Sequence, residues 1–291
     1  MSDELHWMRR RALEMSEQLS GWRRHLHMHP EPGMAEYETA RFVVERLRAI
    51  GIEDVREGVG GTGVVGVVWG RGERCVALRA DLDALEMTED TGAEYASRRA
   101  GLMHACGHDA HVAGLLGAAA ILHEMRAGLP GHVKLIFQPG EESAGGALRM
   151  IEDGVLTDPA VSAIAALHVA PEIPAGQLSL NRGFVTAQSD DVDLVILGES
   201  AHAAHPNQGA DAIAIAAQAL SAIQQFVSRG TAPVHRKVVT FGMIHGGTRR
   251  NILADRVELT GTIRSFEYDT REAIVDFIGN RLRAIVSELG G

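Results

Sequence analysis

The chain has 291 residues, of which 45% are hydrophobic, 23% charged and 4% aromatic. This composition excludes disordered, collagen-like and coiled-coil chains, and the length predicts two domains. Its 28 Lys and Arg residues against 38 Asp and Glu residues leave a net charge of -10, which argues against nucleic acids and anionic membranes as partners.

Both the N-terminal segment and the cysteine content predict a cytoplasmic protein. The first residues are acidic and lack the apolar segment of a signal peptide. No apolar run reaches the length of about 18 residues that a membrane helix needs. The two cysteines, Cys75 and Cys106, cannot build a disulfide framework.

The first part of the chain predicts alternating helices and strands. Apolar residues at helical spacing indicate the helices, and short β-rich runs bounded by glycine indicate the strands. The predicted helices cover residues 5–28, 36–50, 109–125 and 144–152, and the predicted strands cover residues 63–69, 75–78, 133–137 and 162–167. Such an alternation of helices with near-continuous apolar strands is typical of an α/β fold with a mostly parallel sheet covered on both faces.

A second unit begins near residue 184 and has a different order of elements. Its predicted strands cover residues 191–197, 237–243 and 256–264, and its predicted helices cover residues 210–227 and 270–289. This βαββα order is one strand short of a ferredoxin-like unit. We therefore expect one domain over residues 1–183 and a second, lacking its last strand, over residues 184–291.

The strongest chemical motif is His104-Ala-Cys106-Gly-His108-Asp109-Ala-His111, directly before and at the start of a predicted helix. A thiolate and an imidazole two residues apart can bind one metal ion or two neighbouring ones. Thiolate, imidazole and carboxylate ligands together suit zinc and other divalent transition metals. This segment therefore predicts a metal site.

Further candidate ligands follow the ends of three predicted strands. Glu141 and Glu142 follow one strand, His168 ends another, and Asp81 and Asp83 end a third. In parallel sheets, functional groups gather at the carboxyl ends of the strands. Together with the histidine cluster, these strand ends predict a hydrolytic metal site at one edge of the sheet.

Other catalytic schemes fit the sequence less well. The glycine pattern over residues 58–63 leads into a strand, whereas a dinucleotide-binding loop must open a helix. The chain has no G-x-S-x-G nucleophile motif, no H-E-x-x-H helix and no C-x-x-C pair of a deaminase. A Cys106 nucleophile remains a weaker alternative, because its acidic and histidine-rich surroundings suit a metal ligand better.

From about residue 20 to its end, the chain resembles the metal-dependent amidohydrolase/aminoacylase family. Members of this family include hippurate hydrolases, indole-acetyl-amino-acid hydrolases and N-acetyl-diaminopimelate deacetylases. The matching motifs are Arg24-His-Leu-His27-Met-His-Pro30-Glu31, Arg79-Ala-Asp-Leu-Asp83-Ala-Leu85, Met103-His-Ala-Cys-Gly-His-Asp109, Gly140-Glu-Glu142, Leu167-His168-Val169, Ala201-His202-Ala-Ala, Gly246-Gly-Thr248, Asn251 and Gly261-Thr-Ile-Arg264.

The resemblance implies a zinc-peptidase-like catalytic domain with two divalent metal ions, Mn²⁺ or Zn²⁺, with Co²⁺ or Ni²⁺ as alternatives. It places metal ligands at Cys106, His108, Glu142 and His168 and a general base at Glu141. It also implies an inserted ferredoxin-like lid domain through which two chains form a homodimer.

Within that lid, the resemblance assigns His202 to a catalytic contact with the partner subunit's active site. It assigns Asn251 and Arg264 to the substrate carboxylate. The family continues beyond the point that corresponds to Gly291 and supplies one more histidine ligand there, so we expect the chain to be incomplete.

The function implied is hydrolysis of the amide bond of N-acyl amino acids, such as hippurate-like or N-acetyl amino acid substrates. Two alternatives stay open. The first is a metallocarboxypeptidase or dipeptidase of the same family. The second is an inactive, truncated fragment that binds metal and dimerises.

Overall fold

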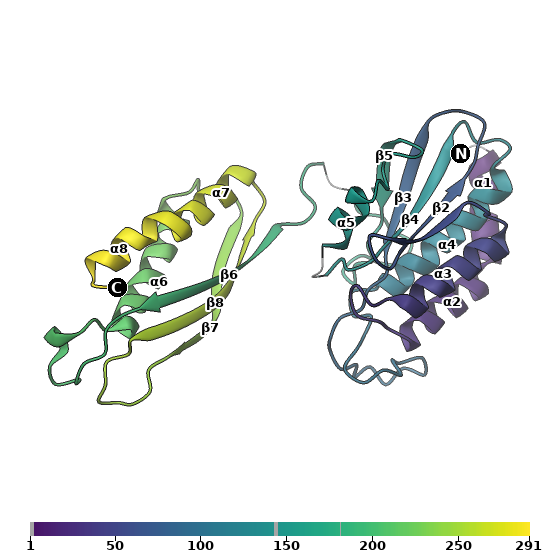
Figure 1. Ribbon diagram of the computed structural model, residues 1–291. Coiled ribbons are helices and arrows are strands. Elements are labelled where there is room, and N and C mark those ends of the chain that lie inside the picture. Colours follow the sequence, from purple (N-terminus) through teal and green to yellow (C-terminus); the bar gives the residue numbers. More distant parts are fainter. Residues whose placement is uncertain (1–2, 143–144, 181) are drawn as a thin grey trace. The chain divides into compact units, whose positions relative to one another are not determined.

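The computed structural model describes residues 3–142, 145–180 and 182–291, and the chain divides into two compact units (Figure 1). Unit 1 is Met1–Ala175 and unit 2 is Gly176–Gly291. The sequence places the domain boundary slightly later, between residues 183 and 184. Each unit has its own hydrophobic core, since no buried residue belongs to the core clusters of both units.

The described part of unit 1 contains five helices: α1 (Asp3–Glu14), α2 (Ser16–Met28), α3 (Tyr37–Ile50), α4 (His108–Met125) and α5 (Gly146–Glu152). The predicted helix over residues 5–28 is in fact two helices, which meet at the buried Met15. As predicted, α3 stops at Gly51, whose φ of 101° lies in the left-handed region that glycine adopts without strain. Ala144, where the last of these helices is predicted to begin, lies outside the described residues.

A five-stranded sheet forms the centre of unit 1, with the order β1-β2-β4-β3-β5. Its strands are β1 (Val55–Val59), β2 (Gly63–Val68), β3 (Cys75–Asp81), β4 (His132–Gln138) and β5 (Val161–Ala166). β3 pairs in parallel with β4 and β5, whereas β2 pairs antiparallel with β1 and β4.

The sheet is therefore mixed, and the prediction of a mostly parallel sheet holds only for β3, β4 and β5. The reason lies in the short connections. Parallel neighbours need a crossover of about a dozen residues or more. Residues 60–62, which connect the neighbours β1 and β2, are too short for one. Residues 69–74 connect β2 to β3 on the far side of β4 and are too short to carry the chain back along the sheet, so β3 and its parallel neighbour β4 run opposite to β2.

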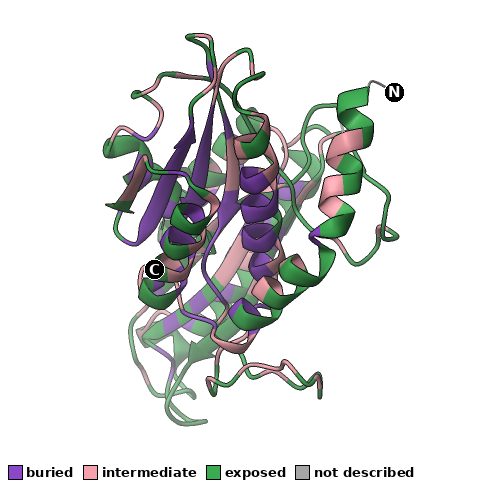
Figure 2. Ribbon diagram, turned by 90° about the vertical axis from the view of Figure 1, so that its right-hand side faces the viewer, coloured by how far each residue is buried: buried purple, intermediate pink, exposed green. Residues whose placement is uncertain are grey.

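Alternate residues of the central strands point to opposite faces of the sheet, as the pleat requires. Leu135 and Phe137 of β4 pack in the core cluster that includes α3 and α4, whereas Ile136 packs with Met150 of α5. Figure 2 shows the buried residues concentrated along these strands and on the helix faces that cover them.

β5 is an exception, because its residues 162–166 are exposed although their apolar sequence predicts a covered strand. It is an edge strand that pairs only with β3. Burial of an edge strand depends on elements outside the strand itself, and strand composition cannot reveal them.

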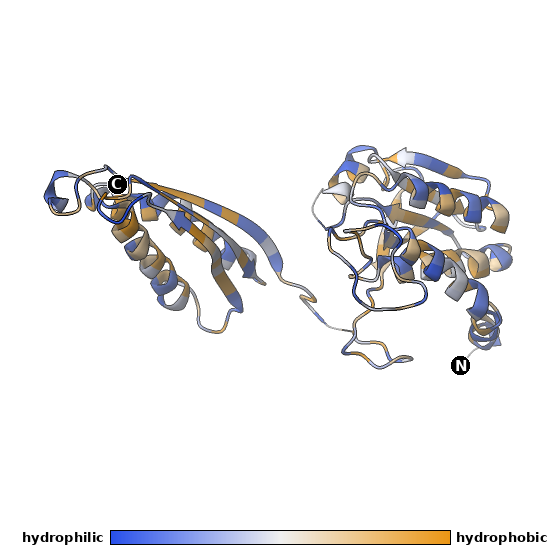
Figure 3. Cartoon of the chain, turned by 90° about the horizontal axis from the view of Figure 1, so that it is seen from below, coloured by the Kyte–Doolittle hydropathy of each residue, from blue (hydrophilic) through white to orange (hydrophobic). Residues whose placement is uncertain are grey.

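Unit 2 contains a three-stranded antiparallel sheet in the order β6-β8-β7. Its core includes Ile223, Leu259 and Ile274, which lie between helices and sheet, and Figure 3 shows hydrophilic and hydrophobic residues alternating along its strands. A π-helical turn interrupts the predicted helix 270–289. The elements are β6 (Gln188–Leu197), η1 (Pro206–Gln208), α6 (Ala212–Arg229), β7 (Lys237–Gly246), β8 (Arg256–Ser265), α7 (Tyr268–Asp276), η2 (Phe277–Arg281) and α8 (Leu282–Glu288).

Across the described parts of both units, no helix combines the length and the apolar character needed to cross a lipid bilayer.

The separate cores predict separate responses to core mutations. Leu135 and Leu259 are fully buried at the centres of the two sheets. The three tryptophans lie at positions 7, 22 and 69, so tryptophan fluorescence reports on unit 1. We expect Leu135→Ala to lower the free energy of unfolding in a urea titration followed by fluorescence by about 2–5 kcal/mol. The matched control Leu259→Ala should leave that transition unchanged, and a shift of similar size in both variants would contradict separate cores.

Candidate metal centre

The turn between Cys106 and His108 brings a thiol and an imidazole to the start of α4. Gly107 between them has a φ of 88°, and a Cβ atom on it would lie 2.3 Å from Cγ2 of Val169. Glycine is therefore required both by the left-handed backbone and by the close approach of the segment that follows β5. This packing brings the Cys106 Sγ atom to 3.3 Å from the His168 Nε2 atom.

The parallel register brings the polar ends of β3, β4 and β5 to the same edge. Asp81 pairs with Gln138 across β3 and β4, and Arg79 pairs with Ala166 across β3 and β5. The residues that follow these strands therefore meet: Asp83 after β3, Glu141 and Glu142 after β4, and His168 after β5. The Glu142 N–H donates a hydrogen bond of 3.0 Å to the Asp83 carboxylate and ties two of these ends together.

Main-chain oxygens orient both imidazoles. The Nδ1–H group of His108 donates to the carbonyl oxygen of Asp83 at 2.8 Å, and that of His168 donates to the carbonyl oxygen of Val169 at 2.6 Å. In each neutral ring, the lone pair is then on Nε2. A hydrogen bond from one ring nitrogen is the usual way in which proteins orient a histidine ligand.

The Nε2 atom of His108 is buried and has no hydrogen-bond partner among the described residues. Three carboxylate oxygens surround it, at 3.7 Å from Asp81, 3.8 Å from Glu142 and 4.0 Å from Glu141. A buried acceptor among acidic groups is costly unless a cation or a proton lies between them. This arrangement fits a bound metal ion.

Among the residues that the structure describes, three overlapping groups of side chains can hold metal ions, with their ligand atoms within 4.8 Å of one another. They are Cys106 with His108 and His168, His108 with Glu141 and Glu142, and Asp81 with His108 and His111. Sulfur, imidazole and carboxylate donors in such proximity suit Zn²⁺ and similar divalent ions. All four predicted ligands and the predicted base Glu141 belong to these groups.

The electrostatics of the site oppose a free thiolate. Burial raises the pKa of Cys106 to about 12, and the negative charges of Glu142, Glu141 and Asp81 act in the same direction. Burial also raises the pKa of Glu141, with a further contribution from Glu142, while His108 and Arg79 oppose the change. The negative charge that adds to burial in raising both pKa values is what a divalent cation would neutralise.

The pKa of Asp81, in contrast, is lowered. Burial alone would raise its pKa, but the hydrogen bond from His111 and the charges of His108 and Arg79 lower it from 3.8 to about 2. Because the folded-state pKa lies below the ordinary value, Asp81 stabilises the metal-free fold above pH 3.8, and this contribution is lost as the pH falls through about 2.

Two buried carboxylates make supporting contacts that have no signal in the sequence. The buried Glu36 accepts a hydrogen bond of 2.8 Å from Gly140 N–H, which anchors the loop that carries Glu141. Asp109, also buried, accepts from His27 Nδ1 and Arg23 Nε of α2, both at 2.7 Å. His27 and Asp109 lie 82 residues apart in the sequence, and Glu36 and Gly140 lie 104 residues apart. No local pattern could therefore have revealed these contacts.

The predicted site residues of unit 2 fall into two places. His202 forms an isolated bridge with Ile252, and the carbonyl oxygen of Asn251 accepts from Ala203 N–H, so His202 and Asn251 lie on adjacent segments. Arg264 lies at the far end of β8, whose ten residues span roughly 33 Å at about 3.3 Å each. Within one chain, Arg264 is therefore not brought together with the other two.

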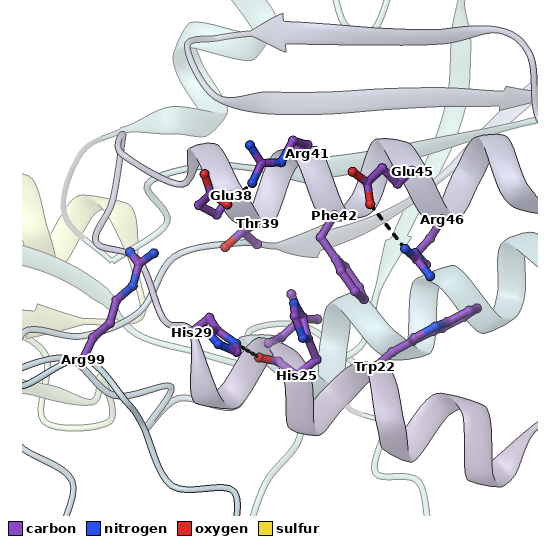
Figure 4. Close-up of a pocket in the computed structure, with 11 residues that line it drawn as sticks. Trp22, His25, His29, Glu38, Thr39, Arg41, Phe42, Glu45, Arg46 and Arg99 are labelled. Carbon is purple, nitrogen blue, oxygen red and sulfur yellow. Dashed lines mark hydrogen bonds and ion pairs between the residues drawn. The ribbon is translucent and has the colours of Figure 1, made fainter.

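A cavity of about 590 Å³ lies apart from these metal-binding groups, between α2 and α3 (Figure 4). The ring of His25 stacks on Phe42 there, and the guanidinium group of Arg46 lies 5.0 Å from the centre of the Phe42 ring. The two acidic side chains lining it, Glu38 and Glu45, are paired with neighbouring arginines. None of its lining residues belongs to the metal-binding groups.

Comparison with known proteins agrees with this geometry. Residues 77–286 match the model of peptidase family M20/M25/M40. The chain belongs to this family. It is 42% identical, over 89% of its length, to an N-acetyl-L-cysteine deacetylase of Bacillus subtilis and 40% identical, over 92% of its length, to thermostable carboxypeptidase 1 of Saccharolobus solfataricus. It spans 62% of the deacetylase and 68% of the carboxypeptidase, and less than two thirds of two other relatives, a probable hydrolase of Synechocystis and an IAA-amino acid hydrolase of Arabidopsis thaliana.

A solved structure of an M20 relative matches both units. The chain superimposes on the Bacillus subtilis YXEP protein, a dinuclear metal binding peptidase from the M20 family, with a TM-score of 0.80. The two proteins are 35% identical, and the match covers 94% of this chain and 71% of that one. The α/β fold is therefore that of the M20 family.

The raised pKa of Cys106 predicts a slow reaction of the metal-free thiol with iodoacetamide, because only the thiolate reacts. Glu142→Gln removes a negative charge beside the thiol, lowers its pKa and should accelerate alkylation near pH 8. Mass spectrometry of a Cys75→Ser background isolates the reaction at Cys106. The control Glu152→Gln, on α5, should not change the rate. Alkylation of the parent chain as fast as a free thiol would contradict this prediction.

Proposed function

We propose that this protein is a metal-dependent amidohydrolase that cleaves the amide bond of N-acyl amino acids. The observation that carries the proposal is a cluster of possible metal ligands at the carboxyl edge of the sheet. It comprises two overlapping groups, Cys106 with His108 and His168, and His108 with Glu141 and Glu142, and the ligand atoms of each group lie within 4.8 Å of one another. The N-acetyl-L-cysteine deacetylase relative supports the substrate class. Because the chain spans only part of such relatives, the proposal concerns the whole protein.

We assign metal binding and catalysis to residues 1–183 and a lid and dimerisation role to residues 184–291. Cys106, His108, Glu142 and His168 would hold two divalent ions, Mn²⁺ or Zn²⁺, with Co²⁺ or Ni²⁺ as alternatives. The dinuclear YXEP protein supports the number of ions. When bound, such ions polarise the substrate carbonyl group and acidify water.

Glu141 is the proposed general base. It follows β4 beside the proposed ligand Glu142, and its carboxylate reaches to 4.0 Å from His108 Nε2. It would take a proton from the attacking water and return it to the leaving amine. The raised pKa of Glu141, caused first by burial and then by Glu142, makes this carboxylate a stronger base than an exposed one.

His202 is the proposed hydrogen-bond donor to the developing oxyanion. Its Nδ1 atom accepts a hydrogen bond of 3.1 Å from Ala204 N–H. A main-chain N–H can only donate, so the hydrogen of the neutral ring is on Nε2. Nε2–H is then the group that can stabilise negative charge in the transition state.

Asn251 and Arg264 are the proposed partners of the substrate carboxylate. They lie toward opposite ends of β8, and one carboxylate cannot contact both of them within a single chain. If both residues act on the same substrate, two copies must contribute them. This separation favours the homodimer that we propose.

Replacement of Glu141 by Gln should separate metal binding from catalysis. The amide keeps the shape of the side chain but cannot accept a proton, so we expect loss of N-acetyl-L-cysteine hydrolysis with unchanged Zn²⁺ binding by calorimetry. Glu142→Gln is the matched comparison, and it should weaken Zn²⁺ binding because a proposed ligand is lost. Substantial turnover by Glu141→Gln would remove Glu141 from the role of base.

The alternatives differ in substrate and in turnover. A carboxypeptidase or dipeptidase is favoured by the similarity to thermostable carboxypeptidase 1. An inactive metal-binding fragment that dimerises is the third candidate. A panel of N-acetyl-L-cysteine, hippurate and dipeptides with free amines distinguishes them: we expect release of amino acid from the first two only. Preferential cleavage of dipeptides would favour the peptidase, and Zn²⁺ binding without any turnover would favour the fragment.

A further inference from the structure

His111 lies one turn after His108 on α4 and uses both of its ring nitrogens in hydrogen bonds. Nδ1 is 2.6 Å from the Asp81 carboxylate, and Nε2 is 2.9 Å from the main-chain nitrogen of Val169. The main-chain N–H of Val169 is a donor, so Nε2 accepts and the hydrogen on Nδ1 is donated to Asp81. His111 thereby links the end of β3 to the segment that follows β5.

The residue that His111 holds is also the one that orients His168. Val169 receives a hydrogen bond at its carbonyl oxygen from His168 Nδ1–H, at 2.6 Å, while its N–H is bound by His111. The rings of His111 and His168 lie edge to face, with their centres 4.6 Å apart. A chain of hydrogen bonds thus runs from Asp81 to His111, from His111 to the main chain of Val169, and from there to the imidazole of His168, which lies beside Cys106.

The same hydrogen bonds argue against His111 as a metal ligand. Its ring lies within reach of an ion held by Asp81 and His108. A ligand needs a lone pair, and the one on Nε2 already accepts from Val169 N–H. Metal binding by His111 would break one of its two hydrogen bonds and release the segment after β5.

We propose that His111 is a positioning residue, which sets the direction of the His168 imidazole through the main chain of Val169. This inference rests on the metal centre proposed above. Residues that support ligands in this way typically change metal affinity about 10–100-fold when replaced. His111→Phe keeps a flat ring of similar size but removes both hydrogen bonds.

A double-mutant cycle on the 291-residue chain tests the proposal. Zn²⁺ affinity is measured in competition with a chelating dye for the parent chain, His111→Phe, His168→Ala and the double variant. We expect His111→Phe to weaken binding about 10–100-fold. We also expect the double variant to bind as weakly as His168→Ala alone, because His111 acts through His168.

His123→Phe is the matched control, because His123 lies near the other end of α4 and should leave the affinity unchanged. Circular dichroism checks the fold of each variant. If His111→Phe does not fold, His111→Leu takes its place in the cycle, since its aliphatic side chain can make neither the hydrogen bond to Asp81 nor the one from Val169.

Two results would overturn the inference alone: a His111 variant that binds Zn²⁺ as the parent chain does, or effects of the two mutations that multiply. Absence of Zn²⁺ binding by the parent chain, with His111 intact, would instead overturn the proposed metal centre and this inference with it.

Discussion

Parallel pairing of β3 with β4 and β5 is the constraint on which the candidate site depends. The pairing places Asp81 opposite Gln138 and Arg79 opposite Ala166, so the three strands end at one edge and the polar residues after them converge. Parallel neighbours run in the same direction, and this makes the convergence possible. The antiparallel β1 and β2 contribute to the core and not to the metal-binding groups.

Concentrating carboxylates at this edge has an energetic cost that the surrounding structure offsets only in part. Asp81, Asp83 and Asp109 are all at least 99% buried, and each accepts hydrogen bonds from a histidine, an arginine or a main-chain N–H. Buried charges without such partners would be strongly destabilising. Burial and the neighbouring Glu142 together raise the pKa of Glu141, so part of this cost remains in the metal-free protein.

Local patterns were sufficient to predict which side chains gather at this edge of the sheet, and long-range contacts account for what they missed. Glu141, Glu142 and His168 follow apolar strands, and Cys106 and His108 lie two residues apart, so a short sequence window reveals each of them. Family resemblance, rather than spacing, divided these residues into ligands and base. The hydrogen bond from Gly140 N–H to Glu36 joins segments 104 residues apart, and no sequence pattern near Glu36 predicts it. The mixed sheet is a different case, because the short connections over residues 60–62 and 69–74 already require β2 to run opposite to β1 and β3. The exposure of β5 depends instead on its place at the sheet edge.

The carbonyl oxygens that hold His108 and His168 have a consequence for how this site can vary. Many metal-binding histidines are oriented by an acidic side chain, which a single codon change can remove and which a drop in pH can protonate. A peptide oxygen is subject to neither event. For His168, the choice of ring nitrogen that faces the site is therefore insulated from substitutions at Val169. For His108, the Asp83 carboxylate also lies 3.3 Å from Nδ1, so a substitution at Asp83 removes that charged neighbour and leaves the main-chain hydrogen bond in place.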